Sequence, residues 1–271
     1  IKKYKDIVKN PQDTILFDWE QHNKLMQRSG ELGADGKLFT LSNSEITRVS
    51  FIEKILVSLL TKLSNFVPDA GIWLNTQRPE WNDANNALVG NGASMVTLYH
   101  LRRYINFFVK VLSLNPSKQY TISNEVAELL KDIFAVFNDN AIHLEKGFTD
   151  LSRRLFTDSL GNAGCSYRSS VYSGFDGKTS DVKVEKILDF LVLSLSFINQ
   201  SIASNKREDG LFHSYNLLEF SPENVRVQNL QLMLEGQAAV LTSEYLNAEE
   251  TVELMGALFK SELWREDQQS F

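Results

Sequence analysis

The sequence has few of the residues that form disulfide frameworks and metal sites. It contains one cysteine, Cys165, and four histidines in 271 residues. A single cysteine excludes an intramolecular disulfide and a zinc site made of thiolates. The histidines lie far apart without metal-ligand spacing, so we expect no metal. One cysteine fits either a reducing or an extracellular compartment. We favour the cytoplasm, which is reducing.

The sequence also lacks long apolar runs and an excess of basic residues. No apolar run reaches the roughly 18 residues that a membrane helix needs, so no membrane is expected. Lysine and arginine number 28 against 34 acidic residues, a net charge of -6. Binding of nucleic acid relies on clustered basic residues, so no nucleic acid is expected as a partner. The chain begins with Ile1 rather than Met, and we expect it to be a piece of a longer polypeptide.

Helical periodicity is what the sequence has in abundance. Hydrophobic residues make up 43% of the chain. They recur at spacings of three and four, as at Ile52, Leu56, Leu59 and Leu63, which lines one face of a helix. The predicted helices span residues 45–66, 93–113, 126–144, 149–156, 184–202, 228–245 and 249–263. No strand series with hairpin turns is found. We therefore expect a single all-α domain over residues 1–271, built from antiparallel helical hairpins.

Two helix starts and three long loops are marked in the sequence. Ser42 with Glu45, and Asn247 with Glu250, have the capping-box spacing. Loops longer than about 12 to 15 residues usually carry function. Three such loops are predicted, at residues 67–92, 157–180 and 206–227.

The first of these loops has the composition of a sugar site. Residues 69–90 hold two tryptophans, three carboxylates and four asparagines. Aromatic rings offer a face to the C–H side of a sugar ring, and carboxylates and amides bind its hydroxyls. A carboxyl group beside an indole is partly desolvated. Its pKa rises, so it can stay protonated as a general acid.

A motif in this loop resembles a known family. Residues 80–86 read Glu-Trp-Asn-Asp-Ala-Asn-Asn. They are similar to the D-W-N-D-G-M-N signature of the cellobiose phosphorylase family of inverting glycoside phosphorylases, and the similarity continues through Val89, Gly90, Gly92 and Ser94. The resemblance implies that Asp83 is the general acid that protonates the glycosidic oxygen.

The resemblance also implies a fold, a substrate and a partner. The family folds as a double-shell (α/α)6 barrel, and this chain resembles its later half. We thus expect an oligosaccharide substrate, the rest of the barrel or a companion chain as a partner, and no cofactor, with inorganic phosphate as a candidate co-substrate. A homo-oligomer is a further alternative. The resemblance has departures: Ala84 replaces a glycine, Asn85 replaces a methionine, and the downstream Thr-Gly-Ser stretch has no counterpart. The choice between phosphate and water as the nucleophile therefore stays open.

Other residues are candidates for binding the sugar. Tyr167, Arg168 and residues 175–177 bear a fainter likeness to a Tyr-x-Arg and an aromatic-Asp-Asp-Gly element of the family. The candidate substrate-binding residues are Trp81, Glu80, Asn82, Arg78, Trp73, Tyr167 and Arg168. An inverting hydrolase would also need a second carboxylate about 6.5 to 9.5 Å from the first, and Glu235 is the candidate.

Each candidate also has a structural interpretation. Asp83 could cap a helix, Glu80 could pair with Arg78, and the tryptophans could belong to the core. Glu235 could be a solvated residue of a helix. The functional alternative to an enzyme is a helical module that binds carbohydrate, or serves as a scaffold, without catalysis.

Overall fold

The computed structural model describes residues 1–38, 40, 46–75, 88, 90–174 and 177–271. The described helices are α1 (Tyr4–Lys9), α2 (Trp19–Leu32), η1 (Gly33–Lys37), α3 (Phe51–Leu63), α5 (Met95–Leu112), α6 (Asn124–Asp139), α7 (His143–Lys146), α8 (Asp150–Ser173), α9 (Val184–Ser204), α10 (Leu234–Thr242) and α11 (Ala248–Lys260). The described strands are β1 (Phe66–Val67), β2 (Gly71–Trp73), β3 (Gly92–Ser94), β4 (Gln119–Ser123), β5 (Thr179–Lys183), β6 (Tyr215–Phe220) and β7 (Val225–Asn229).

Helices α3, α5, α6, α8 and α9 enclose the main hydrophobic core. A group of phenylalanine rings lies at its centre. The ring of Phe137 lies 4.9 Å from that of Phe197 and 5.4 Å from that of Phe156, both in perpendicular arrangements. Such edge-to-face pairs add to the stabilisation from buried area. The helices predicted at 93–113 and 184–202 are confirmed as α5 and α9.

Helix starts follow local capping chemistry. The predicted capping box of Asn247 and Glu250 is confirmed at the start of α11, with both hydrogen bonds formed. The first long helix begins later than predicted, because the side chain of Ser50 accepts a hydrogen bond from the backbone N–H of Glu53. The predicted cap at Ser42 lies outside the described residues.

The prediction of an all-α domain, and with it of part of an (α/α)6 toroid made of helical hairpins, is wrong. The structure is about 58% helix and 14% strand. An antiparallel sheet has the order β1-β2-β3-β6-β7, and β4 pairs with β5. Strands β1, β2 and β3 are two or three residues long and fully buried. Because both of their faces are covered, they lack the apolar and polar alternation that identifies strands in a sequence.

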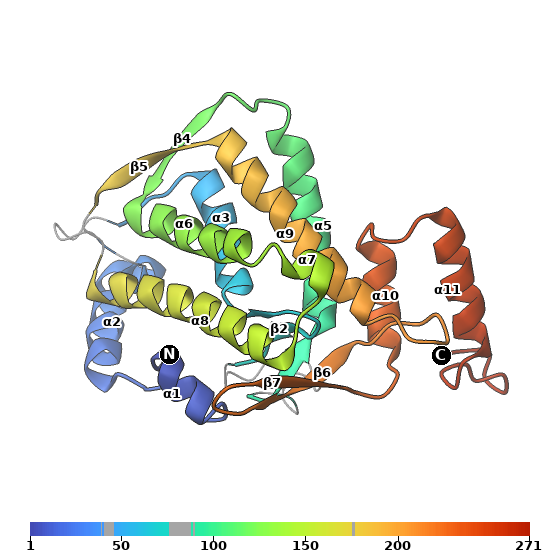
Figure 1. Cartoon of the computed structure of the whole chain (residues 1–271). Coiled ribbons are helices and arrows are strands. Elements are labelled where there is room, and N and C mark those ends of the chain that lie inside the picture. The colour runs from blue at the N-terminus through green and yellow to red at the C-terminus, as the bar shows by residue number, and fades with distance from the viewer. Residues whose placement is uncertain (39, 41–45, 76–87, 89, 175–176) are drawn as a thin grey trace.

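The five-stranded sheet separates two hydrophobic clusters. Phe66 and Ile72, which face each other across β1 and β2, belong to the core of the helices. Trp73 and Ala93, which face each other across β2 and β3, belong to a second cluster with Tyr4 of α1. Figure 1 shows the sheet below the helical layer, with α1 beside it. The predicted loops 67–92 and 206–227 thus contain most of this sheet. The predicted helix 228–245 begins only at Leu234, because residues up to Asn229 pair as β7.

The predicted loop 157–180 is mostly helix. The predicted short helix 149–156 continues to Ser173 as α8. Its second half is rich in serine and glycine, which are poor helix formers. Gly161 nevertheless has a packing role, because a Cβ there would lie 2.0 Å from the ring of Tyr4. Tertiary packing therefore stabilises a helix that its sequence disfavours.

Helix α9 is, among the described residues, the one helix long and apolar enough to span a membrane by length and composition. A single such helix is weak evidence for a membrane span. Nine residues of α9 are buried, and the helix packs against α5 and α6. Its apolar character is thus accounted for by its place in the core.

A buried arginine joins the sheet to the helices. Arg153 of α8 is 7% exposed. Its guanidinium donates to the carbonyl oxygens of Pro68 and Val225 at 2.9 and 3.0 Å. It also forms ion pairs with Asp69 at 2.9 Å and with Asp150 at 2.7 Å. One side chain therefore fixes the turn between β1 and β2 and the start of β7 against α8.

We predict that Arg153→Met lowers the free energy of unfolding by about 2–4 kcal/mol, because buried carbonyls and the Asp69 carboxylate lose their donor. The matched control is Arg226→Met, since the Arg226 guanidinium is 71% exposed and 3.8 Å from Asp150. It should cost less than about 0.5 kcal/mol. Urea unfolding measures both variants. Equal losses would contradict the role given to Arg153.

Candidate functional site

The motif segment, residues 76–87, lies outside the described residues. It includes five candidate site residues, Arg78, Glu80, Trp81, Asn82 and Asp83. The structure does describe where the chain leaves β2 and where it enters β3. We call residues 73–75 and 90–92 the motif base.

Backbone hydrogen bonds hold the two sides of the motif base together. The N–H of Leu74 donates to the carbonyl oxygen of Gly92 at 2.8 Å, and the N–H of Gly90 donates to that of Leu74 at 2.6 Å. The carbonyl oxygen of Asn91 accepts from the N–H of Leu218 in β6 at 2.7 Å. The antiparallel pairing of β2 and β3 is thereby extended and joined to β6.

The side chain of Trp73 connects the motif base to the second hydrophobic cluster. Its side-chain Nε1 donates to the carbonyl oxygen of Gly90 at 2.9 Å. Its ring lies 4.7 Å from Phe220 and 6.4 Å from Tyr4. The sequence made Trp73 a candidate for sugar binding. At 3% exposure its ring faces are covered by protein, so the described contacts give it an anchoring role.

Gly90 lies under the segment that follows α1. Its φ is +92°, a conformation that side chains with a Cβ rarely adopt. A Cβ at this position would also lie 2.6 Å from the carbonyl oxygen of Pro11. The backbone near Pro11 therefore approaches the motif base as closely as a glycine permits.

Tyr215 and Glu235 form a pair next to β3. Tyr215 begins β6, is 2% exposed and faces Ser94 across the sheet. Its hydroxyl donates to the Oε2 atom of Glu235 at 2.8 Å. Glu235 lies in the first turn of α10, where the helix dipole favours a carboxylate. Its side chain is exposed, so the carboxylate is both oriented and accessible to solvent.

The start of α10 is fixed by hydrogen bonds to the chain before β6. The N–H of Gly236 donates to the side-chain oxygen of Ser214 at 2.8 Å. The side-chain amide of Gln237 accepts from the N–H of Phe212 at 2.9 Å and donates to its carbonyl oxygen at 2.7 Å. These bonds set the position of Glu235 relative to Tyr215, which no sequence pattern had indicated.

A chain of three side-chain amides, of which Asn205 and Asn216 are buried, connects this region to the turn at Asp69. Asn229 donates to the side-chain oxygen of Asn216, and Asn216 donates to that of Asn205, each at 2.8 Å. Asn205 in turn donates to the carbonyl oxygen of Asp69 at 2.7 Å. The end of α9, the sheet and the first turn are therefore parts of one hydrogen-bonded unit.

Tyr167 and Arg168 lie elsewhere, in the second half of α8. Helical rise places Tyr167 about 20 Å along the axis from Arg153 at the sheet. Tyr167 packs on the main core. Burial raises the pKa of its hydroxyl, as do the carboxylates of Glu53 and Glu125. The described contacts do not bring these residues to Tyr215 or Glu235. Of the fainter element at 175–177, the first two residues lie outside the described chain.

No group of three or more His, Cys, Asp or Glu that could hold a metal ion is found in the described part of the chain. No protein-family model matches the sequence, and no curated protein matches it either. The resemblance to the cellobiose phosphorylase family therefore depends on the motif residues alone.

We predict that Gly90→Ala destabilises the protein by more than about 2 kcal/mol, because it adds backbone strain and a clash with Pro11. The control is Gly256→Ala in α11, where no atom lies within 4 Å of a new Cβ. This helix position should gain about 0.5–1 kcal/mol. Thermal unfolding of both variants gives the comparison. A stable Gly90→Ala protein would show that the approach of Pro11 is not needed.

Proposed function

We propose that this chain is part of an enzyme that cleaves a glycosidic bond with inversion, with Asp83 as the general acid. The observation that carries the proposal is the attachment of the motif segment. It is joined at both ends to adjacent strands, and its base is bonded to β6 and anchored by Trp73. A general acid must lie within hydrogen-bond reach of the leaving oxygen, and a rigid support for its segment favours this.

The composition of the segment supplies the chemistry. Proton donation near neutral pH requires a carboxyl group whose pKa is raised, and we assign the desolvation that raises it to the indole of Trp81, two residues before Asp83 in the sequence. Proton transfer to the oxygen between two sugars converts it into a neutral leaving group. The anomeric carbon is then attacked from the opposite face, which inverts its configuration.

Two nucleophiles are compatible with this mechanism. A phosphate anion attacks without help from a protein base. Water needs a carboxylate to remove its proton, and Glu235, oriented by Tyr215, is the described residue suited to that role. The proposal therefore includes Glu235 only in the hydrolytic reaction.

The proposal includes a partner that covers apolar surface. Phe51 and Leu114 are each 76% exposed, and α2 has no buried residue in its 14 positions. Large exposed apolar side chains such as these are typical of surfaces that contact another protein. We propose the remainder of the catalytic domain, or a companion chain, for this role.

The first functional prediction concerns Asp83. Asp83→Asn in the intact polypeptide should reduce cleavage of a disaccharide panel by at least about 10²-fold, because the amide cannot donate the proton. Released sugar and sugar 1-phosphate are measured with and without inorganic phosphate, and circular dichroism checks the fold. Undiminished cleavage would reject the assignment. If the unmodified protein binds sugars but forms no product, the non-catalytic module is the better interpretation.

A second prediction separates the two nucleophiles. Glu235→Gln should lower hydrolysis by about 10²–10⁴-fold but leave phosphate-dependent cleavage nearly unchanged, because only water needs a base. Glu249→Gln, in the first turn of α11, is the matched control and should change neither rate. An equal loss in both reactions would mean that Glu235 binds substrate instead. Full hydrolysis by the variant would exclude it as the base.

A further inference from the structure

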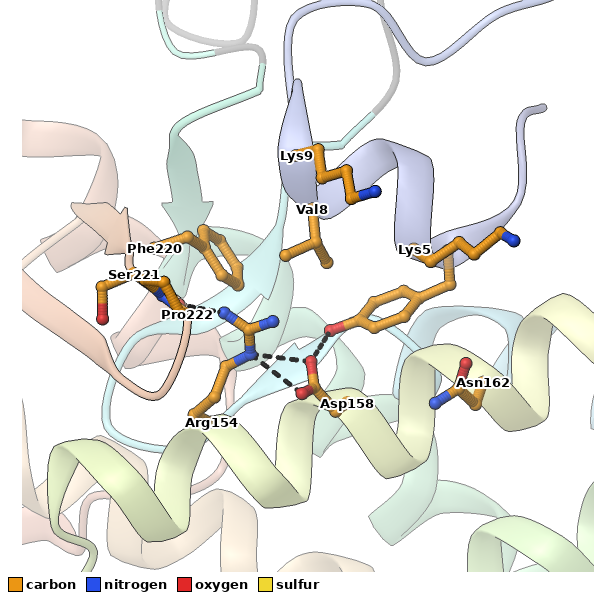
Figure 2. Close-up of a pocket in the computed structure, with 10 residues that line it drawn as sticks. Lys5, Val8, Lys9, Arg154, Asp158, Asn162, Phe220, Ser221 and Pro222 are labelled. Atoms are coloured by element: carbon orange, nitrogen blue, oxygen red, sulfur yellow. Dashed lines mark hydrogen bonds and ion pairs between the residues drawn. The ribbon is translucent and has the colours of Figure 1, made fainter.

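A groove lies between α1 and the β6–β7 hairpin. It consists of two adjoining hollows of about 520 and 460 Å³, both lined by Val8, Lys9 and Phe220. Figure 2 shows the first hollow, with α8 below and the β6–β7 turn opposite α1. The second hollow reaches Asn91 of the motif base. Volumes of this order are typical of sites that enclose a small organic ligand.

The charges that line the groove are unequal. Four lining side chains are basic and two are acidic: Lys5, Lys9, Arg154 and Arg226 against Asp158 and Glu219. Arg154 donates to both carboxylate oxygens of Asp158 at 2.9 Å. Arg226 lies opposite Glu219 in the register of β6 and β7, and its guanidinium forms a long ion pair with Asp150 at 3.8 Å.

Two lysines remain after this pairing. Neither Lys5 nor Lys9 forms an ion pair with any residue in the described part of the chain. They stand one helical turn apart on α1, and both side chains extend from it in the same direction (Figure 2). A local excess of positive charge in a protein with a net charge of -6 favours an anionic ligand.

The remaining walls suit a sugar better than a small free ion. Phe220 is half-buried and supplies an apolar part of the wall, with the ring of Trp73 4.7 Å and the guanidinium of Arg154 5.7 Å from the centre of its ring. Amide side chains of Asn91, Asn162 and Gln228 line the two hollows and can bind hydroxyls. A phosphate or sulfate ion would occupy only a small part of this space.

We infer that the groove binds an acidic saccharide, a sugar chain that carries a carboxylate near Lys5 and Lys9. The inference rests on the proposed function, because it makes the groove an extension of the substrate site at the motif base. It also goes beyond that function, since it assigns a preference for anionic over neutral chains.

Calorimetric binding to the intact polypeptide tests this preference. The probes are a trigalacturonate and a neutral trisaccharide, at low ionic strength and in about 0.5 M salt, where charge attraction is screened. We expect tighter binding of trigalacturonate, weakened about tenfold by the double variant Lys5→Gln and Lys9→Gln and also by salt. The matched control is Lys54→Gln with Lys260→Gln, which removes two exposed lysines from α3 and α11. It should leave binding unchanged.

Three results would overturn the inference. They are equal affinity for the acidic and neutral probes, equal effects of the two double variants, or inorganic phosphate binding as tightly as trigalacturonate. The Asp83→Asn variant, which should lose cleavage but keep lysine-dependent binding, separates this inference from the proposed function. If the protein binds trigalacturonate through the two lysines but cleaves no glycoside, the groove inference stands and the proposed enzyme is rejected. If it cleaves glycosides but its binding of trigalacturonate does not depend on the lysines, the proposed enzyme stands and the groove inference is rejected.

Discussion

The arrangement of the sheet depends on the hydrogen bonds and ion pairs of the Arg153 guanidinium. The guanidinium connects α8 to the Pro68–Asp69 turn and to the first residue of β7. Asp69 has a φ of +64°, which is costly for a residue other than glycine. The backbone N–H of Asp69 donates to Ser201, and its carbonyl oxygen accepts from Asn205. These bonds offset the strain and fix β2, from which the motif segment begins.

The sequence identified the helices better than the strands, for a physical reason. An amphipathic helix such as α5 displays its period locally, because one of its faces packs on the core and the other meets solvent. Residues 71–73 and 92–94 are buried, and the second of these strands pairs with β6 more than 120 residues later. No local pattern reports such a contact. Helix α8 is longer than the sequence predicts. Gly161 lowers the helical propensity of this segment, but its lack of a side chain lets the ring of Tyr4 pack against the helix and stabilise it.

The residues of the candidate site likewise fall into those that local sequence indicates and those that only the fold brings together. The cluster of indole, carboxylate and amide groups around Asp83 is contiguous in sequence, so composition and motif could indicate it. The other residues assigned to the candidate site are not contiguous in the sequence. Tyr215 meets Glu235 because Ser214 and Gln237 hold α10 against the chain before β6. Lys9 lines the hollow that reaches Asn91 only because α1 packs beside the sheet. Each of these contacts depends on tertiary structure, which sequence spacing does not report.

The packing of α1 makes the groove and the motif base mutually dependent. An isolated helix of six residues is unstable in water, so α1 requires its tertiary contacts. Tyr4 supplies them, with its ring against Gly161 and its hydroxyl donating to Asp158 at 2.7 Å. Burial, with the charge of Asp158, raises the pKa of the Tyr4 hydroxyl above its ordinary value, so the hydroxyl remains a donor at physiological pH. The same helix places Lys9 in the groove and leads to Pro11 against Gly90. A loss of the Tyr4 contact would therefore disturb the groove and the base of the motif together.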